Sequence, residues 1–236
     1  MSSILYKRTV KINDKISIYI PTVGEIIDNE NDYYSVVTIL TAMPIDLLVL
    51  LDQGGIDFTE INEYELFLLM FESLRATDTS LVFGDLDFLK FKIAVNQQNG
   101  NIVLHDWENN ITIDRAIYNK IAGVLRKIHH FEKNRRKPAN EEAKKYMLER
   151  AKKKARRNAR REQTSQLEPL ITAMVNTKEF KYDYESVRGL SIYQFNESVR
   201  QIVKKVDYDN LMHGVYAGTI NTKELSQDDL NWLVHK

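Results

Sequence analysis

The sequence contains no cysteine in its 236 residues. This absence excludes disulfide bonds, thiolate metal sites and a cysteine nucleophile, and it fits folding in a reducing compartment. The first fifteen residues carry charges every few positions and no apolar stretch, so no signal peptide is predicted. The longest apolar runs, residues 47–51 and 66–71, are far shorter than the roughly 20 residues that cross a bilayer. We therefore expect no membrane span.

The common motifs of catalysis and phosphate binding are also missing. No glycine-rich loop ends in Gly-Lys-Ser/Thr, and neither Gly-x-Gly-x-x-Gly nor Gly-x-Ser-x-Gly occurs. We interpret Ala217, Gly218 and Thr219 as a helix C-cap rather than a phosphate cradle. The histidines lack the spacing of a helical zinc site, and His129 and His130 are interpreted as a surface pair. We expect no cofactor, no metal site and no enzymatic activity.

The residues that are present predict a mainly helical α+β fold. Hydrophobic residues make up 43% of the chain, enough for one large core or two small ones. Alternation within residues 4–20 predicts a hairpin, and three-and-four spacing over 22–74 predicts three or four short helices around one core. Residues 88–113 shift to a period of two, which indicates a three-stranded meander. Asp114 is expected to cap an amphipathic helix whose apolar face extends to Phe131.

The second half of the sequence reads as helical throughout. Residues 167–175 form a short apolar pattern, and an aromatic loop follows at 178–184. Ser191 is expected to cap a helix with Ile192, Phe195, Val199, Ile202 and Val206 on one face, and Gly218 to end it. We predict an N-terminal helical domain with a small antiparallel sheet at residues 1–132, a basic helix or linker at 133–165, and a helical C-terminal domain at 166–236.

Positive charge is concentrated in one stretch, residues 133–161. The stretch holds 14 basic residues and three acidic ones, a surplus of 11. Because the whole chain has 33 basic and 33 acidic residues, the remainder carries the opposite surplus. Asn140, followed by Glu141 and Glu142, marks a helix start after Pro138. The only apolar line is narrow and mostly alanine, which predicts a helix standing proud of the body or a linker that orders on binding.

Two partners fit this basic segment equally well. Dense Lys and Arg gain free energy from phosphate contacts through counterion release, and with Tyr146 as the sole aromatic no base-stacking platform is built in. The alternative is an acidic protein surface, because the rest of the chain carries matching negative charge. The candidate contact residues are Lys144, Lys145, Arg150, Lys152, Lys153, Lys154, Arg156, Arg157, Arg160 and Arg161.

Aromatic residues cluster in the C-terminal part, and we interpret most of them as core. Phe180, Tyr182 and Tyr184 lie on the loop at 178–184 and are alternatively interface anchors. Tyrosine suits that role because it buries a large apolar area while keeping a polar tip.

Several stretches resemble proteins encoded in the morphogenesis gene blocks of tailed phages of Gram-positive bacteria. They are FKYDY at 180–184, YQFNESVRQI at 193–202, LMHGVYAGT at 211–219 and Leu230-Asn231-Trp232, with YIPTVGEI at 19–26 near the other end. The resemblance implies a tail assembly chaperone or another virion component in the host cytoplasm or virion. Its partners would be the tape measure, tail or baseplate proteins or further copies of itself. The alternative, from the basic segment alone, is a sequence-independent nucleic-acid-binding protein.

Overall fold

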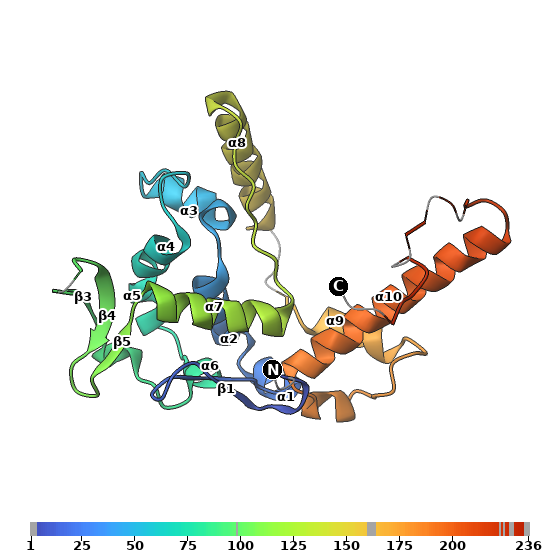
Figure 1. The fold of residues 1–236 in the computed structure, drawn as a ribbon, viewed down its shortest axis with the longest axis horizontal. Coiled ribbons are helices and arrows are strands. Elements are labelled where there is room, and N and C mark those ends of the chain that lie inside the picture. The colour runs from blue at the N-terminus through green and yellow to red at the C-terminus, as the bar shows by residue number, and fades with distance from the viewer. Residues whose placement is uncertain are drawn as a thin grey trace.

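The computed structural model describes residues 4–97, 99–159, 164–221, 223, 225–226 and 229–233. Within them the chain is mainly helical with two small antiparallel sheets, which confirms the predicted α+β class (Figure 1). The strands are β1 (Thr9–Lys11), β2 (Ser17–Tyr19), β3 (Lys92–Val95), β4 (Ile102–Asp106) and β5 (Ile111–Ile113). The α-helices are α1 (Val23–Asp28), α2 (Glu30–Thr41), α3 (Leu48–Gln53), α4 (Glu63–Leu69), α5 (Phe71–Arg75), α6 (Ser80–Phe83), α7 (Arg115–His129), α8 (Glu141–Asn158), α9 (Glu168–Val175) and α10 (Ile192–Tyr216). Short 3₁₀ helices are η1 (Ile4–Tyr6), η2 (Pro44–Leu47), η3 (Phe88–Lys90) and η4 (Ser186–Gly189).

The predicted N-terminal hairpin is present as β1 and β2, with Val10 opposite Ile18. Its apolar residues point into the core, and Ile18 is fully buried. The chain after the hairpin is joined to the C-terminal part by backbone hydrogen bonds. Val23 donates to the carbonyl of Leu190 at 2.9 Å, and Ile192 donates to the carbonyl of Pro21 at 2.8 Å. These bonds fix the start of α10 against the start of α1.

The region between α1 and α5 differs from the prediction in two ways. Five α-helices form where three or four were predicted, because Asn29 interrupts the first helical pattern and Met70 the last. The expected single core is divided in two. Leu48, Leu51 and Phe58 belong to a small second cluster, separate from the main core. Pro44 opens η2 directly before α3, and Gly54 ends α3.

The three-stranded meander is confirmed, with strand order β3-β4-β5 and both pairs antiparallel. Its first strand begins at Lys92 rather than at the predicted position 88, because residues 88–90 form η3 and bury Phe88. Tyr64 connects the sheet to α4, since its hydroxyl donates to the carbonyls of Ile102 and Ile113 at 3.0 and 3.1 Å.

Helix α7 is the central helix of the body. Asp114 caps it as predicted, accepting a hydrogen bond from the Ile117 amide at 2.8 Å. Its face buries Tyr118, Ile121, Leu125 and Ile128 against α2, α4 and α10. The helix ends before the predicted Phe131, because His130 adopts the left-handed conformation with φ 55°.

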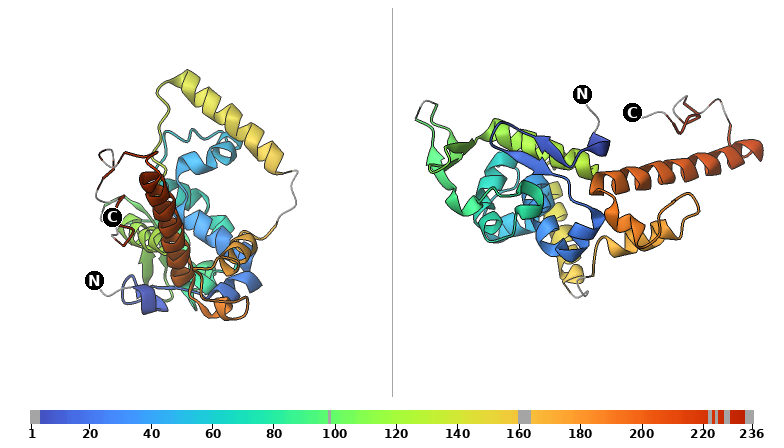
Figure 2. Two further views of the ribbon diagram at one scale, coloured as in Figure 1. Left: turned by 90° about the vertical axis from the view of Figure 1, so that its right-hand side faces the viewer. Right: turned by 90° about the horizontal axis from the view of Figure 1, so that it is seen from below.

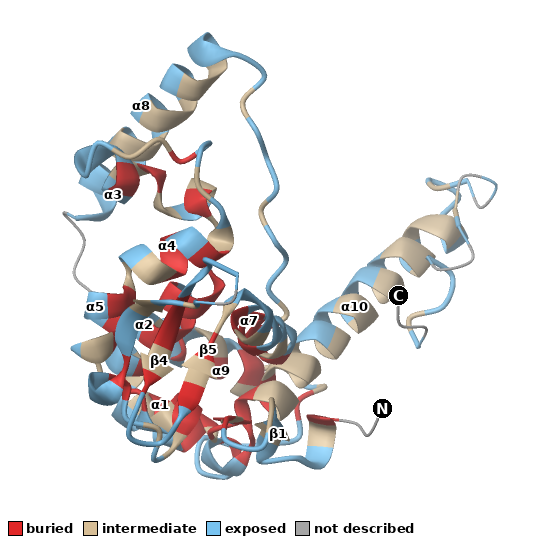
Figure 3. Ribbon diagram, turned by 60° about the vertical axis from the view of Figure 1, so that its left-hand side comes forward, coloured by how far each residue is buried: buried red, intermediate tan, exposed pale blue. Residues whose placement is uncertain are grey.

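Two helices project from this body in different directions (Figures 1 and 2). Helix α8 contains no buried residue, and α10 buries only Ile192 and Phe195 at its first turn (Figure 3). Gly218 ends α10 with φ 73°, which confirms the predicted C-cap. Ser226 and Asp229 exchange backbone-to-side-chain hydrogen bonds in the pattern of a capping box.

The main core takes residues from both sides of the basic segment. Leu167, Ile171 and Met174 of the α9 region pack in the same cluster as the N-terminal helices, as do Leu190 and Phe195. The domain boundaries at 132 and 165 stay predictions, but the segments that they separate share one apolar interior.

Candidate functional site

The basic helix is positioned by a capped start and by the proline before it. The Asn140 side chain accepts from the Ala143 amide at 2.8 Å, and Glu141 and Glu142 lie at the positive end of the helix dipole. Pro138 lies in a connector, residues 131–140, that has no helix or strand. The predicted helix start is confirmed. Of the two predicted forms, a helix matches the structure, but one of its faces contacts the body at α3.

One face of α8 lies against the body and is held by charge. The Lys144 ammonium forms a short hydrogen-bonded ion pair with Asp57, and Lys152 Nζ lies 2.6 Å from Asp52 Oδ2. The hydrogen bond from Lys144, with those from Thr59, lowers the pKa of Asp57 to about 2. Lys144 and Lys152 are among the predicted partner contacts, but each already forms an ion pair with the body. Sequence reasoning did not identify either aspartate, because both lie about ninety residues or more before their partners.

Apolar contacts on the same face are small. Leu148 and Ala151 pack against the second cluster, which is itself built from Leu48, Leu51 and Phe58. Together with Lys144 and Lys152, these residues form what we call the inner face of α8. Of the alanine line from the sequence, Ala151 packs in this face, and Leu148 supplies the largest apolar side chain of the face.

The opposite side, the outer face of α8, exposes its cations to solvent. Within the described part of the chain, none of them forms an ion pair; they are Lys145, Arg150, Lys153, Lys154, Arg156 and Arg157. Arg150, Lys153 and Arg157 fall at three-and-four spacing and so follow one line along the helix with Tyr146. The line from Arg150 to Arg157 spans about 10 Å at 1.5 Å per residue. Arg160 and Arg161 lie outside the described residues.

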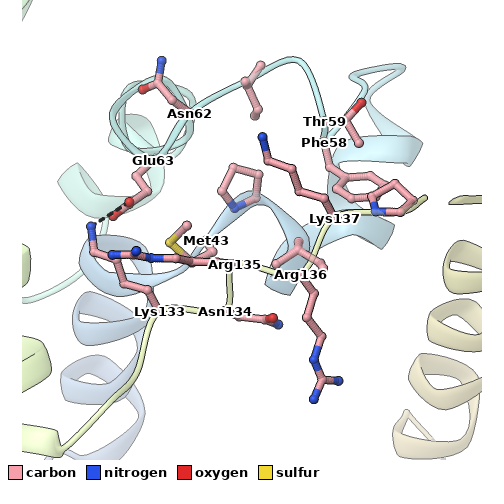
Figure 4. Close-up of a pocket in the computed structure, with 14 residues that line it drawn as sticks. Met43, Phe58, Thr59, Asn62, Glu63, Lys133, Asn134, Arg135, Arg136 and Lys137 are labelled. Carbon is pink, nitrogen blue, oxygen red and sulfur yellow. Dashed lines mark hydrogen bonds and ion pairs between the residues drawn. The ribbon is translucent and has the colours of Figure 1, made fainter. Parts of the chain in front are cut away.

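A pocket opens between the connector and the loops around α3 and α4 (Figure 4). Its volume is about 420 Å³. Apolar side chains form its floor, namely Met43, Pro44, Ile45, Phe58 and Ile61. The connector supplies Lys133, Asn134, Arg135, Arg136 and Lys137 along the other side. No local pattern in the sequence predicts this pocket, because its two walls are far apart in the chain.

The connector is anchored at its first residues. Lys133 Nζ lies 2.7 Å from Glu63 Oε1, and the Asn134 amide donates to Asp46 Oδ1 at 2.9 Å. Arg126 Nη2 lies 2.9 Å from the second oxygen of Glu63 and 2.6 Å from the carbonyl of Thr41. Arg126 is only 7% exposed, so this carboxylate joins α7, α4 and the connector at the edge of the pocket.

His129 and His130 are not the predicted surface pair. His129 is 8% exposed, and its Nε2 lies 2.9 Å from the Tyr33 hydroxyl oxygen. Burial lowers the pKa of His129 to about 4. His130 is half-buried beside Tyr193, and burial also lowers its pKa, although Glu197 opposes the shift. The prediction failed because His129 falls four residues after Leu125 and therefore on the buried face of α7.

The three loop aromatics separate into two kinds. Phe180 is buried and packs edge-to-face on Phe195, which fits the core interpretation and not the interface alternative. Tyr182 and Tyr184 are 39% and 55% exposed and stay candidates for an interface. Tyr182 lines a second, open hollow of about 780 Å³ with Tyr193 and Trp232.

The distal part of α10 exposes apolar side chains. Val203 and Val206 lie one turn apart on the same face and are 52% and 39% exposed. The predicted apolar face of α10 therefore has a buried part and an exposed part. Its first members, Ile192 and Phe195, enter the core, while its last member, Val206, faces solvent. No helix in the described part of the chain is long and apolar enough to cross a membrane.

The sequence of residues 154–235 matches the model of a family described as the YomV second domain. This family is phage-associated, of the Bacillus phage SPBeta type. The match supports a phage protein. It covers about a third of the chain, from the last turn of α8 through α9 and α10, and it includes the C-terminal stretches that resemble phage morphogenesis proteins. No curated protein and no solved structure matches the chain.

Proposed function

We propose that the chain is a non-enzymatic protein of phage virion assembly or structure that acts by binding other phage proteins. The observation that carries this proposal is the projecting part of α10. Beyond Phe195 no described residue of this helix is buried, and Val203 and Val206 are open to solvent. A helix of this kind gains little stability in water unless an apolar face is packed. A partner surface over these valines would supply that packing.

The phage match and the resemblance of the C-terminal stretches to morphogenesis proteins support phage proteins as the proposed partners. Tape measure, tail and baseplate proteins are the candidate clients, and a second copy of the chain is another. Extended clients of this kind bind in apolar grooves and along helix faces. The protein would act in the host cytoplasm during assembly or remain in the virion.

Retrieval of partners from phage-producing cells tests this proposal. The tagged chain should co-purify with a virion protein that mass spectrometry identifies as a tail or capsid component. Val203→Asp should reduce the recovery at least tenfold, because it places a charge in the apolar contact. Asn119→Asp is the matched control, since it adds the same charge at an exposed position of α7. Recovery of the wild-type chain alone, as a monomer, would contradict the proposal.

A second candidate function has its own observation. The outer face of α8 presents six cations without an ion pair in the described structure, and such a line suits the phosphates of DNA or RNA. Tyr146 is the single aromatic residue among them, so contact with the backbone, independent of sequence, is the form expected.

Salt titration separates this candidate from the first. Wild-type retention on double-stranded DNA should fall steeply as salt rises, and Lys153→Gln with Arg157→Gln should reduce the slope of log affinity against log salt by about 2. The matched control removes two charges from the inner face, with Lys144→Gln and Lys152→Gln. Equal slopes for the wild-type and outer-face variants would rule this candidate out.

A further inference from the structure

The pocket beside the connector combines three properties that the two projecting helices do not. It is concave, its floor is apolar, and its rim is cationic. About 420 Å³ lies at the small end of the range for ligand sites and holds one or two apolar side chains. In Figure 4, Lys137 reaches across the opening, whereas Arg136 points to the other side of the connector.

The charge of the pocket is positive. Glu63, an acidic residue in its wall, is already neutralised by Arg126 and Lys133 at 2.9 and 2.7 Å. Arg135, Arg136 and Lys137 form no ion pair with any described residue. An occupant with carboxylates would therefore meet cations that have no competing partner within the protein.

The backbone of the connector is also available. No backbone hydrogen bond joins residues 132–139 to any described residue, although a neighbouring bond from Phe131 closes the end of α7. Apart from Pro138, each of these residues offers one donor and one acceptor. An extended peptide lying alongside them would pair with these groups as an added strand does.

The residues on the floor of the pocket do not suit a nucleic acid as its occupant. Phe58 is the only aromatic residue lining the pocket, and it is 9% exposed, so its ring is not open for base stacking. The remaining floor is aliphatic and thioether, which suits Leu, Ile, Met or Phe side chains.

We propose that this pocket binds a short acidic segment of a partner protein that lies extended along residues 133–138. An apolar side chain of the segment inserts over Ile45 and Ile61, and its carboxylates pair with Lys137 and Arg135. This rests on the proposed protein-binding function, and it names the chemistry of a partner that α10 does not contact. The anchors at Lys133 and Asn134 fix the start of the connector, so little conformational freedom is lost on binding.

Selection from a random twelve-residue peptide library on the immobilised full chain is the test. The recovered peptides should combine Asp or Glu with Leu, Ile, Met or Phe. Fluorescence anisotropy of one labelled winner should show about tenfold weaker binding to Lys137→Gln and to Ile61→Asn, because each removes one of the two contacts. Lys145→Gln is the matched control, because it removes an exposed cation of α8 that does not line the pocket, and it should stay within twofold of the wild type. Circular dichroism confirms that the variants fold.

Three outcomes would overturn the proposal. They are recovery of basic or uncharged peptides, equal affinity for the wild type and Lys137→Gln, and displacement of the labelled peptide by a twenty-nucleotide oligo(dT), which would assign the pocket to phosphates. Val203→Asp separates this site from α10. If that variant loses virion partners but keeps its affinity for the peptide, both proposals are supported. If partner retrieval depends on Val203 while no peptide binds the pocket, only the proposal for the pocket is contradicted.

Discussion

Helices α7 and α8 are consecutive in the chain and have 15 and 18 residues, yet different forces hold them. Helix α7 buries seven residues, among them Tyr118 and Ile121, between the sheet and the neighbouring helices. Helix α8 buries none and rests on two ion pairs and on Leu148 and Ala151. Burial of apolar area makes α7 part of the cooperative core, whereas α8 can leave the body without exposing that core. Both helices have a good N-cap, so capping does not explain the difference.

The largest expected difference in stability comes from replacing Arg126, the buried arginine of α7. Arg126→Met leaves the partly buried Glu63 with only Lys133 and removes the hydrogen bonds to the carbonyl of Thr41. We expect the free energy of unfolding to fall by about 3 kcal/mol in urea denaturation, as for other buried pairs that lose one partner. Lys152→Met, at the more exposed pair of α8, should cost less than about 1 kcal/mol. Equal losses would mean that α8 belongs to the same cooperative unit.

The next largest effect is the pH dependence of the free energy of unfolding that His129 of α7 produces. The pKa of His129 is about 4 in the folded state and 6.5 in an ordinary environment. As pH falls below 6.5, the unfolded chain takes up the proton first, so stability declines by about 1.4 kcal/mol per pH unit until about pH 4. Between pH 7 and pH 5 the wild type should therefore lose about 2 kcal/mol more than His129→Asn. Parallel stability curves for the two proteins would show that His129 is not held neutral.

Removal of the two N-caps compares the helices directly. Asp114→Ala should lower the global free energy of unfolding by about 1 kcal/mol, because α7 unfolds only with the core. Asn140→Ala should leave global stability within about 0.5 kcal/mol and instead speed amide hydrogen exchange along α8 several-fold. Equal losses of global stability in the two variants, or a loss in neither, would contradict the distinction.

The smallest effect is the salt dependence of exchange. Raising sodium chloride from about 0.05 to 0.5 M shortens the screening length to a few ångströms and weakens exposed ion pairs. Amide exchange in α8 should rise about twofold, while α7 should not change. Leu148→Ala should increase the effect of salt on amide exchange in α8, because the ion pairs then supply a larger part of the free energy that holds the helix against the body.

Short-range patterns in the sequence were sufficient for much of the fold. Asp114, Asn140 and Ser191 were recognised as caps because a cap is a local contact between residues two or three positions apart. The same spacing argument could have placed His129 inside, four residues after Leu125. It was missed because a histidine pair beside basic residues resembles a surface feature.

The site itself was predictable only in part. Composition located the cations of residues 133–161, but it could not divide α8 into inner and outer faces. That division depends on Asp52 and Asp57, which spacing does not connect to Lys152 and Lys144. The pocket likewise needs Ile45 and Ile61 beside Lys137, a juxtaposition that exists only after folding. Long-range pairing of this kind leaves no trace in local periodicity.

The excursion from Phe131 to Gln166 begins at the end of α7 and returns at α9, and its described residues, 131–159 and 164–166, add nothing to the main core. Substitutions in such a detour meet few constraints from folding. Its charge pattern can therefore change together with the surface of a binding partner, while the rest of the fold stays the same. Related phages would then differ most in this stretch.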